Sequence, residues 1–314
     1  MYFTKKFKII FVVFIFLLLK SQSSNGLENK ILFKIENEII TSVDIYEEIK
    51  FLKTFNPETS SLSDKELFEI SKNSIIKDKI KKIEIKNYVE ELEIDEKFLI
   101  RLIKGRYSEI GINSIKEFEN YLKDNDLDIR VIKEKFAIEL AWNDLIYQKF
   151  RTKIVIDKDK IKKEVSQNPQ KNTQIELLLS EIIFNVMSKV EFKDKYEKIV
   201  SDIEKIGFKK AALIHSNSET ASTGGLIGWV KEENLNNDIK NIISKLQPGQ
   251  FSKPIRTSSG FMIIQVEDKK EYQTKFNLDD KIEEIIKFKT NEQLNQFSSM
   301  YLNKVKKNYK IYGL

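Results

Sequence analysis

The distribution of glycine and proline constrains the fold of this 314-residue chain more than any other feature of its sequence. The chain contains only 4 Pro and 10 Gly, and such sparse punctuation favours long helices. One stretch differs, because five of the glycines and two of the prolines lie between Gly224 and Gly260. This contrast predicts a mainly helical part and a separate, compact part that is rich in turns.

The N-terminal residues indicate export. A basic patch at residues 5–8 is followed by an unbroken apolar run of 11 residues at 9–19, which ends at Lys20. A helix that spans a membrane needs roughly 20 apolar residues, and a basic patch before a shorter run is typical of a signal peptide. We therefore predict a signal peptide at residues 1–26 and an exported mature protein. A retained membrane anchor is the alternative.

The charge balance gives no indication of a nucleic-acid partner. The formal net charge is +6, but residues 1–26 contribute four lysines and no acidic residue, which leaves +2 on the mature chain. Lys and Glu alternate along the helical stretches and are interpreted as solvated faces. The chain has no Cys, which excludes disulfides and a lipid attached through cysteine. We expect no nucleic-acid partner and no stable membrane insertion after signal cleavage.

Residues 27–165 are predicted to form a helical domain that opens with a hairpin. Apolar side chains alternate along residues 31–35 and return at 39–40, and such alternation indicates strands. The motifs Ser63 with Glu66 and Ser114 with Glu117 have the spacing of capping boxes at helix starts. Four helices are predicted in this domain. The first begins at 41 or 42, the second runs from 63 to about 92, the third begins at 114, and the fourth runs from 129 to 150.

A different pattern begins after a polar stretch at residues 166–173, which is interpreted as a linker. A strand is predicted at 175–184, a helix at 192–206 and a closing strand at 261–266, with the turn-rich stretch between them. The order of these elements predicts a compact unit of strands and helices over residues 171–270.

The C-terminal segment, residues 271–314, returns to a helical pattern from 278 to 307 and ends with a possible strand at 310–313. A single helix of this kind has little partner surface of its own. We therefore expect it to pack on the N-terminal domain. The predicted fold class of the whole chain is α+β.

Five short motifs in the compact unit carry a family resemblance. They are Phe208-Lys-Lys-Ala-Ala, Gly224-Gly225-Leu-Ile-Gly228-Trp229, Leu246-Gln-Pro-Gly249-Gln, Pro254-Ile-Arg-Thr and Ser259-Gly260-Phe. In this order they resemble the signature of the parvulin family of peptidyl-prolyl isomerases. The glycine cluster could also be a phosphate-binding loop, but no Lys-Ser or Lys-Thr follows it.

The parts that flank the compact unit are similar to those of SurA-type periplasmic chaperones. A short hairpin, a helix start at Ser42-Val-Asp and a string of amphipathic helices precede the parvulin-like module, and a helix follows it. The resemblance implies a chaperone with a single parvulin-like domain. Its implied partners are unfolded polypeptides, outer-membrane protein precursors among them. An assembly scaffold for an envelope complex is a further possibility.

The same resemblance implies where a peptide would bind. Similarity to active parvulins places the apolar wall of a proline groove on Ile227, Leu235 and Ile239, with Ser259 at the edge of the groove. An ordinary core would show the same apolar residues, because periodicity does not separate a groove from a core.

Enzyme activity stays open, because both histidines of active parvulins are replaced. The first position reads Glu181, the last reads Met262 beside Phe261, and Ser218 aligns with the Cys or Asp between them. A neutral imidazole donates and accepts hydrogen bonds at once, whereas an ionised Glu only accepts. We therefore interpret Glu181, Phe261 and Met262 as peptide-binding residues. The alternative is an isomerase with an altered site that uses Ser218 and Ser259.

No metal or cofactor is predicted. His215 is the only histidine and no Cys is present, whereas protein zinc sites are built mainly from these two residue types. His215 next to Ser216 could be half of a hydrolase pair, but no nucleophile-elbow motif accompanies it. We interpret His215 as structural.

Overall fold

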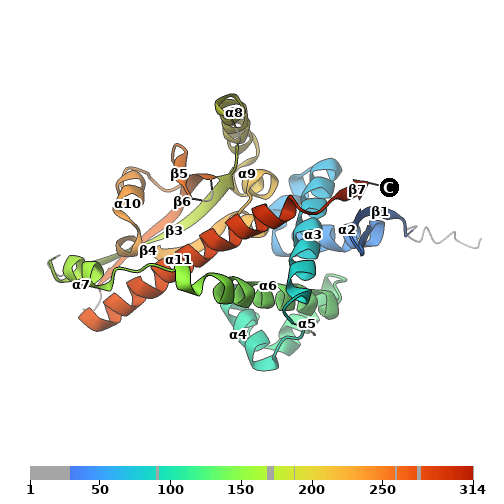
Figure 1. Ribbon diagram of the computed structural model, residues 1–314, viewed down its shortest axis with the longest axis horizontal. Coiled ribbons are helices and arrows are strands. Elements are labelled where there is room, and N and C mark those ends of the chain that lie inside the picture. Colours follow the sequence, from blue (N-terminus) through green and yellow to red (C-terminus); the bar gives the residue numbers. More distant parts are fainter. Residues whose placement is uncertain are drawn as a thin grey trace, which may run out of the picture.

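The computed structural model describes residues 29–89, 92–167, 173–186, 188–258, 260–273 and 277–313 (Figure 1). The predicted signal peptide at 1–26 lies outside these ranges. Helices and two small sheets make up the described part, which confirms the α+β class. None of the helices in the described part is both long and apolar enough to span a bilayer.

A helical body is built from five helices of the N-terminal half. They are α2 (Ser42–Phe55), α3 (Asp64–Lys86), α4 (Glu96–Tyr107), α5 (Ile115–Asp124) and α6 (Ile129–Phe150). The strands β1 (Ile31–Ile35) and β2 (Glu38–Thr41) form the hairpin before them. The side chain of Trp142 on α6 is fully buried in the main apolar cluster of this body, together with Ile80 on α3.

Local capping explains where two of these helices begin. The side chains of Thr41 and Asp44 cap α2 reciprocally, and those of Ser63 and Glu66 do the same for α3, so that free N–H groups at the helix start are satisfied. The helix α3 ends at Lys86 rather than near residue 92. Asn87 follows it as the C-cap, and its N–H donates back to the carbonyl of Glu84.

The C-terminal helix α11 (Leu278–Lys306) crosses the molecule, and β7 (Ile311–Gly313) follows it (Figure 1). Its C-terminal half packs on the helical body, where the indole N–H of Trp142 donates to Ser298 Oγ at 2.8 Å and the Trp142 ring stacks on Tyr301. The strand β7 pairs with β1 and completes a three-stranded sheet in the order β2-β1-β7. The first and last strands of the described part therefore pair on the helical body.

The second sheet has the strand order β4-β3-β6-β5 and is antiparallel throughout. Its strands are β3 (Thr173–Phe184), β4 (Leu226–Lys231), β5 (Ile255–Thr257) and β6 (Gly260–Gln273). The strand β6 continues well beyond the predicted end at residue 266, because its polar second half keeps pairing with β3. The stretch 166–173, predicted as a linker, overlaps helix α7 (Lys158–Gln167) and the start of β3.

Two faces of this sheet are covered by different helices. On one face, α8 (Lys189–Ile206) and α9 (Phe208–His215) pack on Ile182, Phe184 and Ile263. On the other face, α10 (Asn237–Ile243) packs on a cluster that contains Leu179, Ile183 and Met262. We call the second face the α10 face.

Candidate functional site

The α10 face of the sheet brings together three of the predicted peptide-binding residues. Ile239 and Met262 are buried in its apolar cluster, and Leu235 packs on the same cluster while remaining half-buried. Leu235 follows the short 3₁₀ turn η5 (Glu232–Asn234) and Ile239 lies on α10. Leu235 and Ile239 of the predicted wall therefore share one apolar surface with Met262, and we call these three side chains the apolar wall. That a peptide binds to them stays a prediction.

Two other predicted peptide-binding residues, Ile227 and Phe261, do not lie with these three. Ile227 is on the edge strand β4 and its side chain is 40% exposed. Phe261 does not join Met262, because neighbouring residues of a strand point to opposite faces. Phe261 instead packs against Phe184 and Phe192 under α8. Ser259 lies outside the described residues.

Glu181 occupies the α10 face at the start of a chain of hydroxyl groups. The hydroxyl of Thr220 donates to Glu181 Oε1 at 3.0 Å, Thr220 and Ser218 share a hydrogen bond of 2.7 Å, and Ser218 and Ser216 share one of 2.9 Å. Ser216 Oγ also accepts from the backbone N–H of Ile183 at 3.0 Å. These contacts link Glu181 to Ser218, which was predicted from sequence, and to Thr220, which was not.

The environment of Glu181 favours its neutral form. The pKa of Glu181 is raised to about 7. Burial is the main cause and the charge of Glu292 on α11 adds to it, whereas the Thr220 and Ser218 hydroxyls oppose the shift. A carboxyl with this pKa exchanges its proton near neutral pH, and its protonated form both donates and accepts hydrogen bonds. Glu181 therefore recovers part of the hydrogen-bonding capacity of the histidine that it replaces.

Gly225 is required by the close approach of two backbones. A Cβ at this position would lie 2.2 Å from the carbonyl oxygen of Glu181, and φ is +81°. The N–H of Glu181 donates to the carbonyl of Gly225 at 2.8 Å. Gly228 differs, because the space around it is open and only its φ of +100° favours glycine.

His215 has a structural environment. Its Nε2 lies 2.7 Å from Asp202 Oδ2, so that it ties α9 to α8 on the face opposite the α10 face. Burial lowers the pKa of His215 although Asp202 opposes the shift. In the part of the chain that the structure describes, no group of three or more His, Cys, Asp or Glu side chains is placed to hold a metal ion.

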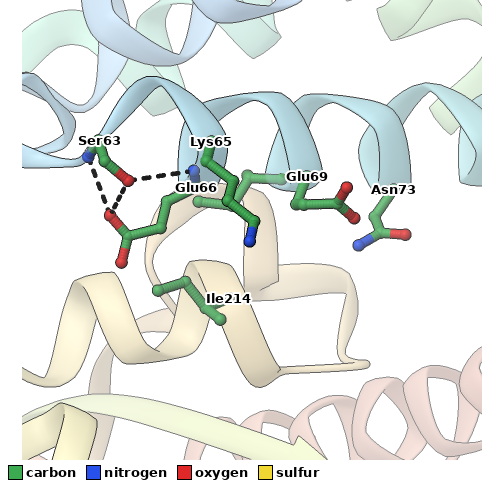
Figure 2. A pocket seen from close by; sticks show the side chains of 7 residues that line it. Ser63, Lys65, Glu66, Glu69, Asn73 and Ile214 are labelled. Carbon is green, nitrogen blue, oxygen red and sulfur yellow. Dashed lines mark hydrogen bonds between the residues drawn. The ribbon is translucent and has the colours of Figure 1, made fainter.

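A hollow with a volume of about 410 Å³ lies where α3 meets α9 (Figure 2). Five of its seven lining residues are polar. Ser63 and Glu66, which line it, are engaged in capping α3, with Ser63 Oγ 2.6 Å from Glu66 Oε2. Ile214 from α9 points into it and Ile70 lies on the α3 side.

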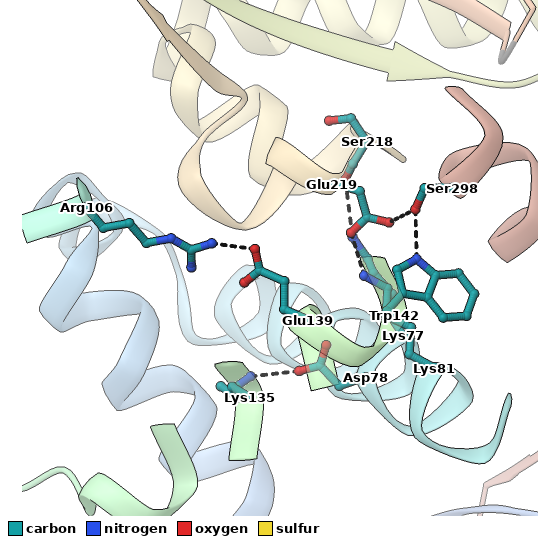
Figure 3. A network of polar contacts seen from close by, with 10 residues as sticks. All are labelled: Lys77, Asp78, Lys81, Arg106, Lys135, Glu139, Trp142, Ser218, Glu219 and Ser298. Atoms are coloured by element: carbon teal, nitrogen blue, oxygen red, sulfur yellow. Dashed lines mark hydrogen bonds and ion pairs between the residues drawn. The ribbon is translucent and has the colours of Figure 1, made fainter. Parts of the chain in front are cut away.

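A polar latch joins the hydroxyl chain to the helical body (Figure 3), and sequence reasoning missed it. Lys81 Nζ lies 2.5 Å from Glu219 Oε2, and Ser298 on α11 donates to Glu219 Oε1 at 3.0 Å. Lys77 Nζ donates to the carbonyl of Ser218 at 3.2 Å. We call these four side chains, with the Ser218 carbonyl, the latch. The only sequence signal was the position of two lysines beside the buried residues Ile76 and Ile80.

Comparison with known proteins places the compact unit in a family. Residues 182–268 match the rotamase family, described as the PPIC-type PPIase domain. This confirms the predicted parvulin domain.

Relatives of the longer chain are chaperones and foldases. The chain is 26% identical over 172 residues to the chaperone SurA of Nitrosococcus oceani, covering 52% of this chain and 40% of that protein. It is 37% identical over 81 residues to SurA of Hahella chejuensis, covering 26% and 19%. To the foldase protein PrsA of Geobacillus kaustophilus it is 27% identical over 191 residues, covering 60% and 64%. The match thus spans less than two thirds of each of these relatives.

Among solved structures, the chain is similar to one that was reported in a description of PEB4 and Cj1289 as two structurally related SurA-like chaperones of Campylobacter jejuni. The similarity covers 91% of this chain and 99% of the other, with 18% identity and a TM-score of 0.35.

Proposed function

We propose that this chain, which carries a PPIC-type parvulin domain and is related to the SurA chaperones and PrsA foldases, is a folding factor that binds unfolded polypeptides. The observation that carries the proposal is the α10 face. It keeps an apolar wall of Leu235, Ile239 and Met262, while Glu181 and Met262 stand where active parvulins have histidines. This combination favours holding a peptide over isomerising it.

The place of action and the clients are part of the proposal. The basic patch and apolar run at residues 5–19 support export to the periplasm behind a signal peptide at 1–26. Clients there would be outer-membrane protein precursors, which are extended and rich in apolar side chains. Weak and repeated binding suits such clients, because a tight complex would delay their release for folding.

We also propose a division of labour along the chain. Residues 27–165 together with 271–314 would form the chaperone domain, and 171–270 the parvulin domain. The packing of α11 on α6 and the pairing of β7 with β1 support this grouping. The helical body exposes Tyr46, Val131 and Tyr147, each by more than a third, which leaves these apolar surfaces available to a client.

The mature chain is expected to slow the aggregation of a denatured β-barrel protein, measured by light scattering. An inert protein at equal mass is the control. Suppression retained by a variant without residues 171–270 would assign client binding to the helical domain. If neither chain slows aggregation, the chaperone proposal fails.

A second candidate is an isomerase with an altered site, and the hydroxyl chain on Glu181 is the observation that favours it. Twisting an X-Pro bond has a barrier of about 18–20 kcal/mol, and a protonated Glu181 near Ser218 could supply hydrogen bonds to the twisted amide.

Replacing Leu235 with Ala is expected to lower the isomerisation rate of a proline peptide about tenfold, because the loss of apolar contact is worth about 1.4 kcal/mol or more. The matched control is Val190→Ala, since Val190 is 73% exposed on α8, away from the α10 face. The same measurement on Ile227→Ala tests whether the edge strand contributes. A wild-type rate no higher than that of buffer would end the isomerase candidate.

A further inference from the structure

One face of α11 lies against the α10 face of the parvulin domain. Residues 281, 284, 288, 292 and 296 follow one another at spacings of three or four, which places them on the same side of a helix. Residues 281, 284, 288 and 296 contact the parvulin domain, from η5 at one end to the turn between β5 and β6 at the other.

The two ends of this contact are polar. At the first end, Lys281 Nζ lies 2.5 Å from Glu233 Oε2, and Glu284 Oε2 lies 2.5 Å from Lys231 Nζ. At the other end, Ser258 Oγ donates to Gln296 Oε1 at 2.9 Å. These partners border the apolar wall, so α11 lies across the wall and not beside it.

The middle of the contact is the apolar wall itself. Phe288 packs on the same cluster that contains Ile239 and Met262, as Leu235 does. An aromatic side chain of α11 therefore covers the surface that the proposed function assigns to a client. Glu292, four residues after Phe288 on the same side of α11, acts electrostatically on Glu181. Burial raises the pKa of Glu292 as well.

The contacts of this face are of a kind that a ligand can displace. The side chains in its ion pairs are about a quarter to two fifths exposed, and such pairs contribute little to stability. The charge of Glu292 raises the pKa of Glu181, so the two carboxyl groups repel each other when both are ionised, and this repulsion opposes closure. The C-terminal half of α11 is held more firmly, through the buried contact of Trp142 with Ser298.

We propose that α11 is an autoinhibitory strap, whose Phe288 side chain covers the apolar wall in the peptide site of the parvulin domain until a client displaces it. This inference rests on the proposed function, because it names the regulation of the same site. A strap of this kind lowers the apparent affinity by the fraction of molecules that are open.

The test measures binding of a fluorescein-labelled proline peptide to the full mature chain. Phe288→Ala is expected to bind the peptide about fivefold more tightly than wild type, because the open fraction rises. The matched control is Lys287→Ala, since Lys287 is exposed on the same helix. It is expected to bind as wild type does.

A second variant holds the strap closed. The chain has no cysteine, so Ser258→Cys with Gln296→Cys gives a unique pair that a short bis-methanethiosulfonate reagent can bridge. The bridged chain is expected to lose at least fivefold in peptide affinity, and reduction should restore it. Each single cysteine variant, treated in the same way, is the control. This arm decides the matter if Phe288→Ala does not fold.

The outcomes separate the strap from the proposed function. Peptide binding that is equal in wild type, Phe288→Ala and the bridged chain overturns the strap and leaves the proposed function standing. Absence of peptide binding in every variant also overturns the strap. Aggregation suppression measured on the same samples then shows whether the chaperone proposal survives without the groove.

Discussion

Replacing Glu219 with Ala is expected to lower the free energy of unfolding by about 2–4 kcal/mol. Breaking a buried ion pair by removing one partner costs about 3–5 kcal/mol, because the other charge stays buried and unpaired. The Lys81 side chain is only 5% exposed, whereas that of Glu219 is 30% exposed, so we place the expected loss below the upper limit. The Ser298 hydroxyl would lose its acceptor on Glu219 as well.

The pKa of Glu219 supports the same expectation and sets its pH range. Burial would raise this pKa, but the charges of Lys81 and Lys77 outweigh it and lower the pKa to about 2. A depressed pKa of a carboxyl stabilises the folded state above the unfolded pKa, near 4.5. The contribution is lost as the pH falls from about 4.5 towards 2.

Urea denaturation at neutral pH measures the effect. The matched control is Glu139→Ala, whose ion pair with Arg106 has side chains 41% and 38% exposed and is expected to contribute at most about 1 kcal/mol. Replacing both partners, Lys81→Met with Glu219→Leu, should recover most of the loss, because no charge is then left unpaired. Equal losses of unfolding free energy in Glu219→Ala and Glu139→Ala would show that the ion pair of Lys81 with Glu219 is an ordinary surface pair.

The latch matters for the site because it connects the hydroxyl chain to the helical body. The Ser218 carbonyl accepts a hydrogen bond from Lys77 on α3, while the Ser218 hydroxyl belongs to the chain that ends at Glu181. The neighbouring residue Glu219 carries the ion pair with Lys81. The polar part of the α10 face is therefore positioned by the helical body as well as by its own sheet, and loosening the latch should also loosen Glu181.

Local signals in the sequence predicted much of the fold. The capping boxes at Ser63 and Ser114 marked helix starts that the structure contains, and the predicted helix from Ile129 to Phe150 has the same bounds in the structure. Such signals act within a few residues and need no tertiary context. The second half of β6 was missed, because its polar residues are held by pairing with β3 rather than by burial.

The site was predictable only in part. The order of the parvulin motifs located Leu235, Ile239 and Met262, which meet on one face. The latch was not predictable, because a lysine on an amphipathic helix has the same pattern whether it faces water or another domain. The groove-facing side of α11 was missed for a similar reason. It mixes charged residues with the single aromatic Phe288, and no periodic signal marks its partner.

Wild-type protein is expected to lose about 3 kcal/mol of stability between about pH 5 and pH 8 through Glu181, and Glu181→Gln should abolish this loss. Burial, aided by Glu292, raises the folded pKa of Glu181 from 4.5 to about 7, although the Thr220 and Ser218 hydroxyls oppose it. Between these two values the folded state holds a proton that the unfolded state has released. Stability is therefore full below about 4.5 and falls as the pH rises through about 7.

Urea denaturation as a function of pH checks this expectation, and the neighbouring part of β3 offers a matched control. Burial would raise the pKa of Glu176, but hydrogen bonds from Lys270 and Tyr272 outweigh it, so that this pKa is lowered. Glu176 therefore titrates below this pH range. Glu176→Gln should keep the wild-type dependence of the unfolding free energy on pH between about pH 5 and pH 8. Gln at position 181 keeps an oxygen for the Thr220 hydroxyl but no titrating proton. Identical pH profiles for wild type and Glu181→Gln would mean that Glu181 is ionised in the folded protein, and its carboxyl could then not supply a hydrogen-bond donor at neutral pH.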